Sequence, residues 1–186
     1  MNQFNNLNVN AKVIYLLSLC ELIIDKISKS EGYEVAVESL EKCWEWVKFK
    51  NIEAYSLYLY LENMDEIDVM TFMQFEEDIN REKVWICLAN ALAYTIWEAY
   101  QYEKEKFLPQ TIESVDYETI ENFLATFNEV YVIDSLADEL LDYFEINYPT
   151  GIDKQVNINS IKTFINSIIE SKKCPKFMKK FGRGCT

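Results

Sequence analysis

The most apolar run of the sequence extends from Val84 to Tyr100, where 14 of 17 residues are apolar. A transmembrane helix needs about 20 consecutive apolar residues, and this run contains Asn90, Thr95 and Glu98. We therefore expect a buried helix at the centre of a globular protein, with no membrane span. Because a helix that is apolar on all sides must be wrapped by amphipathic helices, the run predicts a helical bundle.

The rest of the chain also favours helices. Only four glycines and three prolines occur in 186 residues, which leaves few turns for a sheet-rich fold. The length suits one domain, so we predict an all-α, single-domain bundle of about seven or eight helices over residues 1–171, followed by a basic C-terminal tail, 172–186. Apolar spacing and capping residues place the helices at about residues 10–28, 33–47, 52–62, 65–75, 79–103, 117–127, 135–147 and 158–171.

The 3–4 spacing of apolar residues also predicts which helix faces are buried. The first helix is expected to bury Val13, Leu17, Cys20, Ile24 and Ile27. The second is expected to bury Tyr33, Val37, Leu40, Trp44 and Val47, with Glu34, Glu38, Glu41 and Glu45 outside. The expected N-caps of later helices are Asn51, Asp78, Asp116 (with Glu118 nearby), Asp134 or Ser135, and Asn157 or Asn159.

The composition excludes several kinds of chemistry. The absence of histidine rules out Ser–His–Asp triads, Cys–His pairs, imidazole zinc sites and the Glu-x-x-His half-sites of di-iron bundles. The formal net charge of −13 argues against binding of nucleic acid or an anionic membrane by the whole body. Five cysteines without a C-x-x-C pair indicate a reducing compartment, and the N-terminal MNQFNNLNVN lacks the basic region of a signal peptide. We expect a cytoplasmic protein without a cofactor.

The charges are unevenly distributed along the chain. Residues 1–50 carry six bases and seven acids, residues 51–153 carry four and 23, and residues 154–186 carry eight and one. Between Lys106 and Lys154, eleven acids occur with no base. Such a stretch is either an ordinary solvated face or a surface for a basic partner, where charge raises the association rate and specificity. The basic tail is open to fraying, to packing on the acidic body, or to contact with a membrane or nucleic acid.

Six acids in this stretch are the candidate partner-binding residues. Asp134, Asp138 and Asp142 share one helical face at i, i+4 and i+8, and Glu145 continues it. The other two, Glu118 and Glu121, belong to the preceding expected helix. The neighbouring tyrosines are candidate anchors of an interface, with core packing as the alternative: Tyr117, Tyr131, Tyr143 and Tyr148.

An enzymatic alternative rests on four of the acids. Glu118-x-x-Glu121 followed by Glu139-x-x-Asp142 fits the E-x-x-E…E-x-x-D pattern of all-α nucleoside triphosphate pyrophosphohydrolases. Four carboxylates on two adjacent helices can hold Mg²⁺ through oxygen alone. The same spacing recurs at Glu31-x-x-Glu34, and no base that could clamp a phosphate lies between residues 107 and 153. We therefore favour a protein without a metal site, and a non-inhibitory adaptor remains a third possibility.

Three stretches carry a resemblance to a known family. They are the tryptophan-bearing segment Leu40–Val47, the Tyr/Leu-rich segment Ala54–Glu62, and the segment Trp85–Tyr94. In order and aromatic placement, over about residues 10–170, they resemble an all-helical immunity-protein family of bacterial polymorphic-toxin and contact-dependent inhibition systems, the sixth in that naming series. The resemblance implies a non-enzymatic cytoplasmic protein that neutralises a cognate toxin domain, and the acidic middle segment suits a basic toxin. It leaves the oligomeric state and the toxin's chemistry open.

Overall fold

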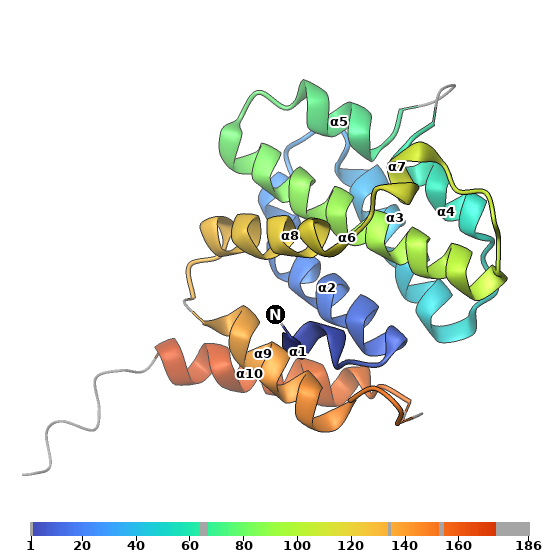
Figure 1. Ribbon diagram of the computed structural model, residues 1–186. Helices are drawn as coiled ribbons and strands as arrows, with labels where there is room; N and C mark the ends of the chain where they lie inside the picture. The colour runs from blue at the N-terminus through green and yellow to red at the C-terminus, as the bar shows by residue number, and fades with distance from the viewer. Residues whose placement is uncertain (1, 64–66, 134, 153–154, 174–186) are drawn as a thin grey trace, which may run out of the picture.

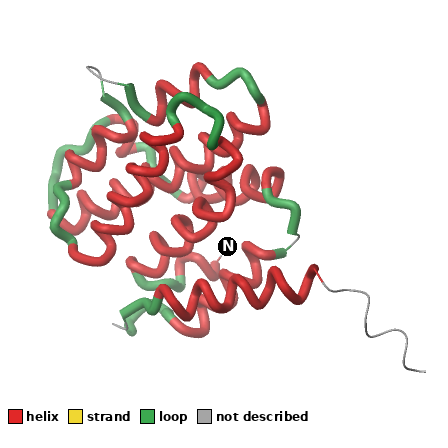
Figure 2. Tube along the Cα trace, turned by 180° about the vertical axis from the view of Figure 1, so that it is seen from behind, coloured by secondary structure: helices red, strands yellow, loops and turns green. Residues whose placement is uncertain are grey.

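The computed structural model describes residues 2–63, 67–133, 135–152 and 155–173. Within these ranges the chain is helical and forms no strand, apart from an isolated backbone bridge between Leu7 and Pro149. The all-α prediction is confirmed (Figure 1, Figure 2). The helices are α1 (Asn2–Asn5), α2 (Val9–Ile23), the 3₁₀ helix η1 (Ile24–Ile27), α3 (Tyr33–Phe49), α4 (Ala54–Leu61), α5 (Val69–Phe75), α6 (Ile79–Glu103), α7 (Gln110–Glu113), α8 (Tyr117–Val130), α9 (Leu136–Asn147) and α10 (Ile158–Lys173).

The longest helix, α6, is the centre of the bundle. It packs against α2, α3, α4, α5, α7 and α8, and 14 of its 25 residues are buried. Asp78 is its N-cap, because the carboxylate accepts from the backbone N–H groups of Asn80 and Arg81. Inside the run, the hydroxyl of Thr95 donates to the Ala91 carbonyl, which satisfies a buried polar group. The expected central helix and its cap are confirmed.

A second helix, α2, is buried almost as fully. Ten of its 15 residues are buried, because α3, α6 and α9 surround it. The expected inward residues Val13, Leu17 and Cys20 are buried, and so are Ile24 and Ile27 in the 3₁₀ turn that ends the helix early. The sequence pattern described one face of α2, whereas the neighbouring helices cover the others as well.

The buried face of α3 differs from the expected one. Leu40 and Val47 are buried as expected, but Tyr33, Val37 and Trp44 are only half-buried. The buried set is Ala36, Ser39, Leu40, Cys43, Trp46 and Val47. Small side chains at the contact allow neighbouring helices to approach closely, and a pattern that counts large apolar residues gives them no weight. The core tryptophan of α3 is therefore Trp46.

The expected cap of α4 is wrong, whereas Asp116 caps α8 as expected but with another partner. Asn51 does not cap α4 but donates a side-chain hydrogen bond to Glu45. The first backbone N–H of α4, that of Ala54, instead donates to the carboxylate of Glu103, 2.7 Å away at the end of α6. In α8 the reciprocal partner of Asp116 is Thr119, the residue three positions on; Glu118 lies one residue too early for that geometry.

The remaining helix ends lie within a few residues of the expected ones; α5 begins later, at Val69, and α8 continues further, to Val130. Asp68 caps α5, and the expected start at Asp65 lies outside the described residues. The side chain of Asn157 accepts from the backbone N–H of Ser160 and so caps α10, which continues to Lys173. The tail beyond that residue, 174–186, is outside the described part of the chain. No described helix combines the length and the apolar composition needed to cross a bilayer.

Three cysteines behave as small core residues. Cys20, Cys43 and Cys87 are buried free thiols, and burial raises the pKa of each thiol, to about 12 for Cys43 and Cys87. They therefore remain protonated and pack as hydrophobes, as the sequence pattern predicted.

Candidate partner-binding site

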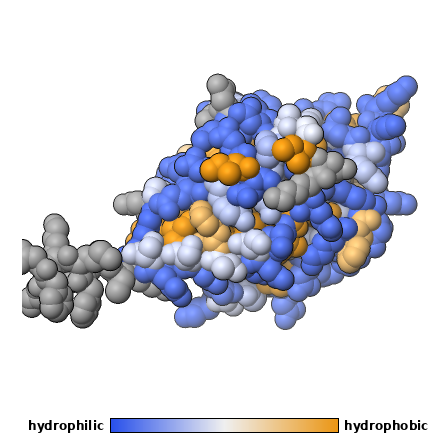
Figure 3. Space-filling view, turned by 90° about the horizontal axis from the view of Figure 1, so that it is seen from below, coloured by the Kyte–Doolittle hydropathy of each residue, from blue (hydrophilic) through white to orange (hydrophobic). Residues whose placement is uncertain are grey.

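The α9 acids lie away from the buried side of that helix. On that buried side, the four residues that the sequence pattern predicted are buried: Leu136, Leu140, Leu141 and Phe144. Asp138 and Asp142 are exposed and Glu145 is half-buried, whereas Asp134 lies outside the described residues. We call Asp138, Asp142 and Glu145 the α9 acidic row. From the side of α9 and α10 the surface is mostly hydrophilic, with separate hydrophobic patches (Figure 3).

The short helix α1 packs against α9 and contacts this row. The Gln3 side-chain amide donates to Asp142 at 2.7 Å, and the Asn6 amide donates to Glu145 at 2.9 Å. Neutral amides hold the two carboxylates in place without cancelling their charge. At the other end of the row is Asp138. Burial of Tyr15 raises the pKa of its hydroxyl, and the charge of Asp138 raises it further. The two hydrogen bonds to Asp142 and Glu145 therefore come from neutral groups and not from bases.

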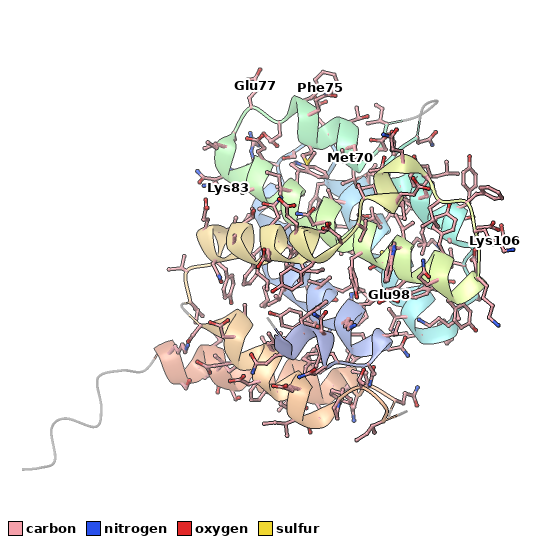
Figure 4. The ribbon with its side chains drawn as sticks, in the orientation of Figure 1. Met70, Phe75, Glu77, Lys83, Glu98 and Lys106 are labelled. Atoms are coloured by element: carbon pink, nitrogen blue, oxygen red, sulfur yellow. The ribbon has the colours of Figure 1, made fainter. Side chains whose placement is uncertain are left out.

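The stretch between Lys106 and Lys154 has no base of its own, but bases from α6 and α10 contact its acids in the folded protein. Lys83 of α6, marked in Figure 4, lies 2.7 Å from Glu129 of α8. Lys172 of α10 lies 2.7 Å from Glu139 of α9 and, by hydrogen bonding, lowers the pKa of that carboxyl. Among the acids of this stretch that the structure describes, Glu129 and Glu139 are thus paired with a base, and neither belongs to the six candidates.

The two candidate acids of α8 are exposed beside an aromatic side chain. Glu118 and Glu121 are exposed, and Tyr117, at the first position of α8, is 42% exposed. Burial and then the charge of Glu121 raise the pKa of the Tyr117 hydroxyl. Of the other candidate anchors, Tyr148 is buried, and Tyr143 and Tyr131 are half-buried against Phe164 and Phe127. Tyr117 is therefore the anchor candidate that the fold leaves available.

The four acids of the enzymatic pattern do not form a metal centre. In the described ranges no three acidic or cysteine side chains converge closely enough to hold a metal ion. Glu139 is directed to Lys172 on α10, and Asp142 is directed to Gln3 on α1. Glu118 and Glu121 stay on α8, so the pattern lacks the geometry that a shared Mg²⁺ site requires.

A cavity of about 500 Å³ lies beside Tyr117, between α1, α2, α6 and α8. Its most buried polar side chain is Glu98, which is 5% exposed and lies on the side of α6 that faces α2 (Figure 4). One carboxylate oxygen of Glu98 accepts the Tyr94 hydroxyl at 2.8 Å. Burial raises the pKa of Glu98, while the Tyr94 hydrogen bond and the charges of Lys12 and Lys50 oppose that shift.

A second cavity, of about 820 Å³, adjoins the first and shares Val9, Glu98 and Gln101 with it. Lys50 lines it, with its ammonium 3.2 Å from the centroid of the Trp46 ring. Burial lowers the pKa of Lys50 to about 8. In the sequence, Glu98 was informative only as a charged residue in the apolar run that argues against a membrane span. The i, i+4 pair of Tyr94 and Glu98 inside an apolar run is the signal that could have marked the site.

The described part of the chain is thus an all-α protein with exposed acids on α8 and α9 and a cavity lined by aromatic rings. The family model "Immunity protein Imm6" matches residues 11–130, and the chain belongs to this immunity-protein family. The resemblance in the sequence is thereby confirmed, and families of this kind are generally non-enzymatic. No curated protein and no solved structure matches the chain. The matched segment runs from α2 to the end of α8, so it includes Glu98 and Glu118 but not the α9 acidic row.

Proposed function

We propose that this protein is a cytoplasmic immunity protein that binds a cognate toxin domain and neutralises it. Membership of the Imm6 immunity family is the single observation that carries the proposal. The six candidate acids, including Asp134, form the contact surface in this proposal. The toxin domain is basic, and the acids occupy the position that the phosphates of its substrate would otherwise take.

The electrostatics support a steering role for these acids. In the α9 acidic row, Asp142 and Glu145 accept from the neutral amides of Gln3 and Asn6, and the α8 acids Glu118 and Glu121 are exposed. Exposed ion pairs contribute only about 0–1 kcal/mol each, so the acids act mainly on the association rate. Tight binding therefore needs a buried anchor, and Tyr117 with the adjoining cavity is the best placed one.

The test is co-expression with the C-terminal toxin domain encoded beside this protein. We expect the wild-type protein to protect cells, whereas an adaptor or scaffold has no effect on toxicity. Reversing Asp134, Asp138 and Asp142 to lysine should slow association by about tenfold or more at low salt, with a smaller loss at high salt, because screening removes long-range steering.

A matched control is available on α3 and the turn before it. Glu31, Glu34 and Glu41 are exposed, and their reversal to lysine changes the net charge by the same amount. The variant of Glu31, Glu34 and Glu41 should associate with the toxin domain at a rate closer to that of the wild type than the variant of Asp134, Asp138 and Asp142 does. If association with the toxin domain slows equally in both triple variants, the effect is due to net charge alone. If the variant of Asp134, Asp138 and Asp142 still protects cells fully, the interface lies elsewhere. Absence of any protection by the wild type would end the immunity proposal.

A further inference from the structure

The cavity beside Tyr117 has aromatic walls from three helices. Phe4 comes from α1, Tyr94 and Trp97 come from α6, and Tyr117 comes from α8. Three of the rings contact one another: Phe4 and Tyr94 meet edge to face at 5.6 Å between centroids, and Tyr94 and Trp97 meet at 5.9 Å. These contacts hold the rings in place before any partner arrives, so little order is lost on binding. Tyr117 stands at the exposed end of this wall.

The cavity combines these rings with two acids and one base. Glu98 and Asp116 both line it. One oxygen of Glu98 accepts from Tyr94, and no side chain in the described part of the protein donates to the other. One oxygen of Asp116 serves as the cap of α8. The base is Lys12, whose ammonium lies 5.9 Å from the centroid of the Phe4 ring. Carboxylates therefore outnumber cations in an aromatic setting.

We propose that this cavity binds the side chain of an arginine presented by the protein partner. The inference rests on the proposed function, since the partner is the basic toxin domain. A guanidinium is planar, stacks on aromatic faces, and is more weakly hydrated than an ammonium. It can also donate charge-assisted hydrogen bonds to a carboxylate. Glu98 has one oxygen left to accept a guanidinium N–H, and Trp97 and Tyr117 have faces to stack on.

The position of the cavity suits a basic partner surface. Glu118 and Glu121 follow Tyr117 on α8, on one side of the cavity. On another side lies α1, whose Phe4 lines the cavity while Gln3 contacts the α9 acidic row. A partner drawn to either group of acids therefore arrives next to the cavity. The acids provide long-range attraction, and the cavity provides a desolvated site for one anchor.

The cavity can be tested without the toxin. The probe is N-acetyl-L-arginine amide, and the matched neutral probe is N-acetyl-L-citrulline amide, which has nearly the same shape without the charge. The readout is the indole N–H resonance of Trp97 in an NMR titration, assigned by its loss in Trp97→Phe. We expect a saturable shift with arginine in the millimolar range, and binding of citrulline at least about tenfold weaker, because citrulline lacks the charge that strengthens the hydrogen bond to Glu98.

Three variants make the test specific. Glu98→Gln keeps an acceptor for Tyr94 and should weaken arginine binding by about tenfold. Lys12→Met removes the competing cation and should strengthen it. Glu62→Gln is the matched control, because Glu62 also accepts a tyrosine hydroxyl four residues earlier, from Tyr58 at 2.8 Å, but lies outside this cavity. That control should bind arginine as the wild type does.

The outcomes separate this inference from the proposed function. Equal binding of both probes, an unchanged affinity in Glu98→Gln, or no Trp97 shift at all would overturn the arginine site whether or not the protein protects cells. If arginine binds as expected, the Glu98→Gln variant should also dissociate faster from the toxin domain. If the Glu98→Gln variant dissociates from the toxin domain at the same rate as the wild type, the assignment of the partner's side chain to the cavity is overturned. If the wild-type protein does not protect cells from the toxin, the proposed function is refuted, but the result with the arginine probe still stands.

Discussion

Replacing Gly32 with alanine should destabilise the protein for lack of space and not for backbone reasons. Gly32 precedes α3 with φ −83°, a conformation that alanine adopts freely. A Cβ at this position would overlap the ring of Phe72 from α5, with Cδ1 at 2.7 Å and two further ring carbons closer still. Phe72 cannot simply recede, because it is stacked on the fully buried Trp85 of α6 at 5.7 Å between centroids.

The magnitude follows from the two ways of relieving this overlap. Forcing an extra methyl group into a packed core costs about 1–3 kcal/mol. If the Phe72 ring swings outward instead, the aromatic contact with Trp85 is lost, at about 0.5–1.5 kcal/mol plus the lost burial. We expect about 2 kcal/mol by either route, which corresponds to a fall of about 4–8 °C in the melting temperature for a chain of this size.

The assay is urea denaturation of Gly32→Ala with and without Phe72→Leu. The smaller leucine leaves room for the methyl group, so the alanine should cost at least about 1 kcal/mol less in that background. Gly151→Ala is the control. Gly151 has φ +80° and open space around its Cβ position, so its cost is conformational and independent of Phe72. A loss for Gly32→Ala that is equal in both backgrounds, or below about 0.5 kcal/mol, would refute the steric argument.

Three further predictions concern buried and capping groups. Burial raises the pKa of Glu98 above its ordinary 4.5, so the folded state binds this proton more tightly and the stability due to this group falls as pH rises through the folded pKa. The unfolding free energy of Glu98→Gln minus that of the wild type should therefore increase from about pH 4 to pH 7 in urea melts, and a constant difference would contradict this. Glu103→Ala should cost about 1 kcal/mol by removing the cap of Ala54, and Glu103→Gln less, because the amide retains an acceptor; equal losses in the two variants would argue against the cap. With the two cysteines of 174–186 replaced by serine, the three buried thiols should react with a thiol reagent only as fast as the protein unfolds, in a colorimetric assay with and without urea.

The sequence was sufficient where the physics is local. The cap at Asp78 needs only a carboxylate next to the first N–H groups of α6, and the burial of α6 follows from its apolar composition. The inward face of α9 follows from 3–4 spacing alone, which also placed Asp138 and Asp142 on a shared outer face. The family was recognisable from the order of the helices and their aromatic residues, and the family model confirms it.

Tertiary structure decided the features that depend on residues far apart in the chain. The cap of α4 comes from Glu103, 49 residues after Ala54, and Lys172 neutralises Glu139 across α9 and α10. The cavity around Glu98 needs α1, α2, α6 and α8 together. Periodicity along one helix reports which face is apolar, but not which neighbour covers it or where the cover stops. The sequence by itself therefore determined the longer helices and the acidic character, but not the short helices α1 and α7. Only the packing decided which acids are paired with a base and where a buried carboxylate meets open space.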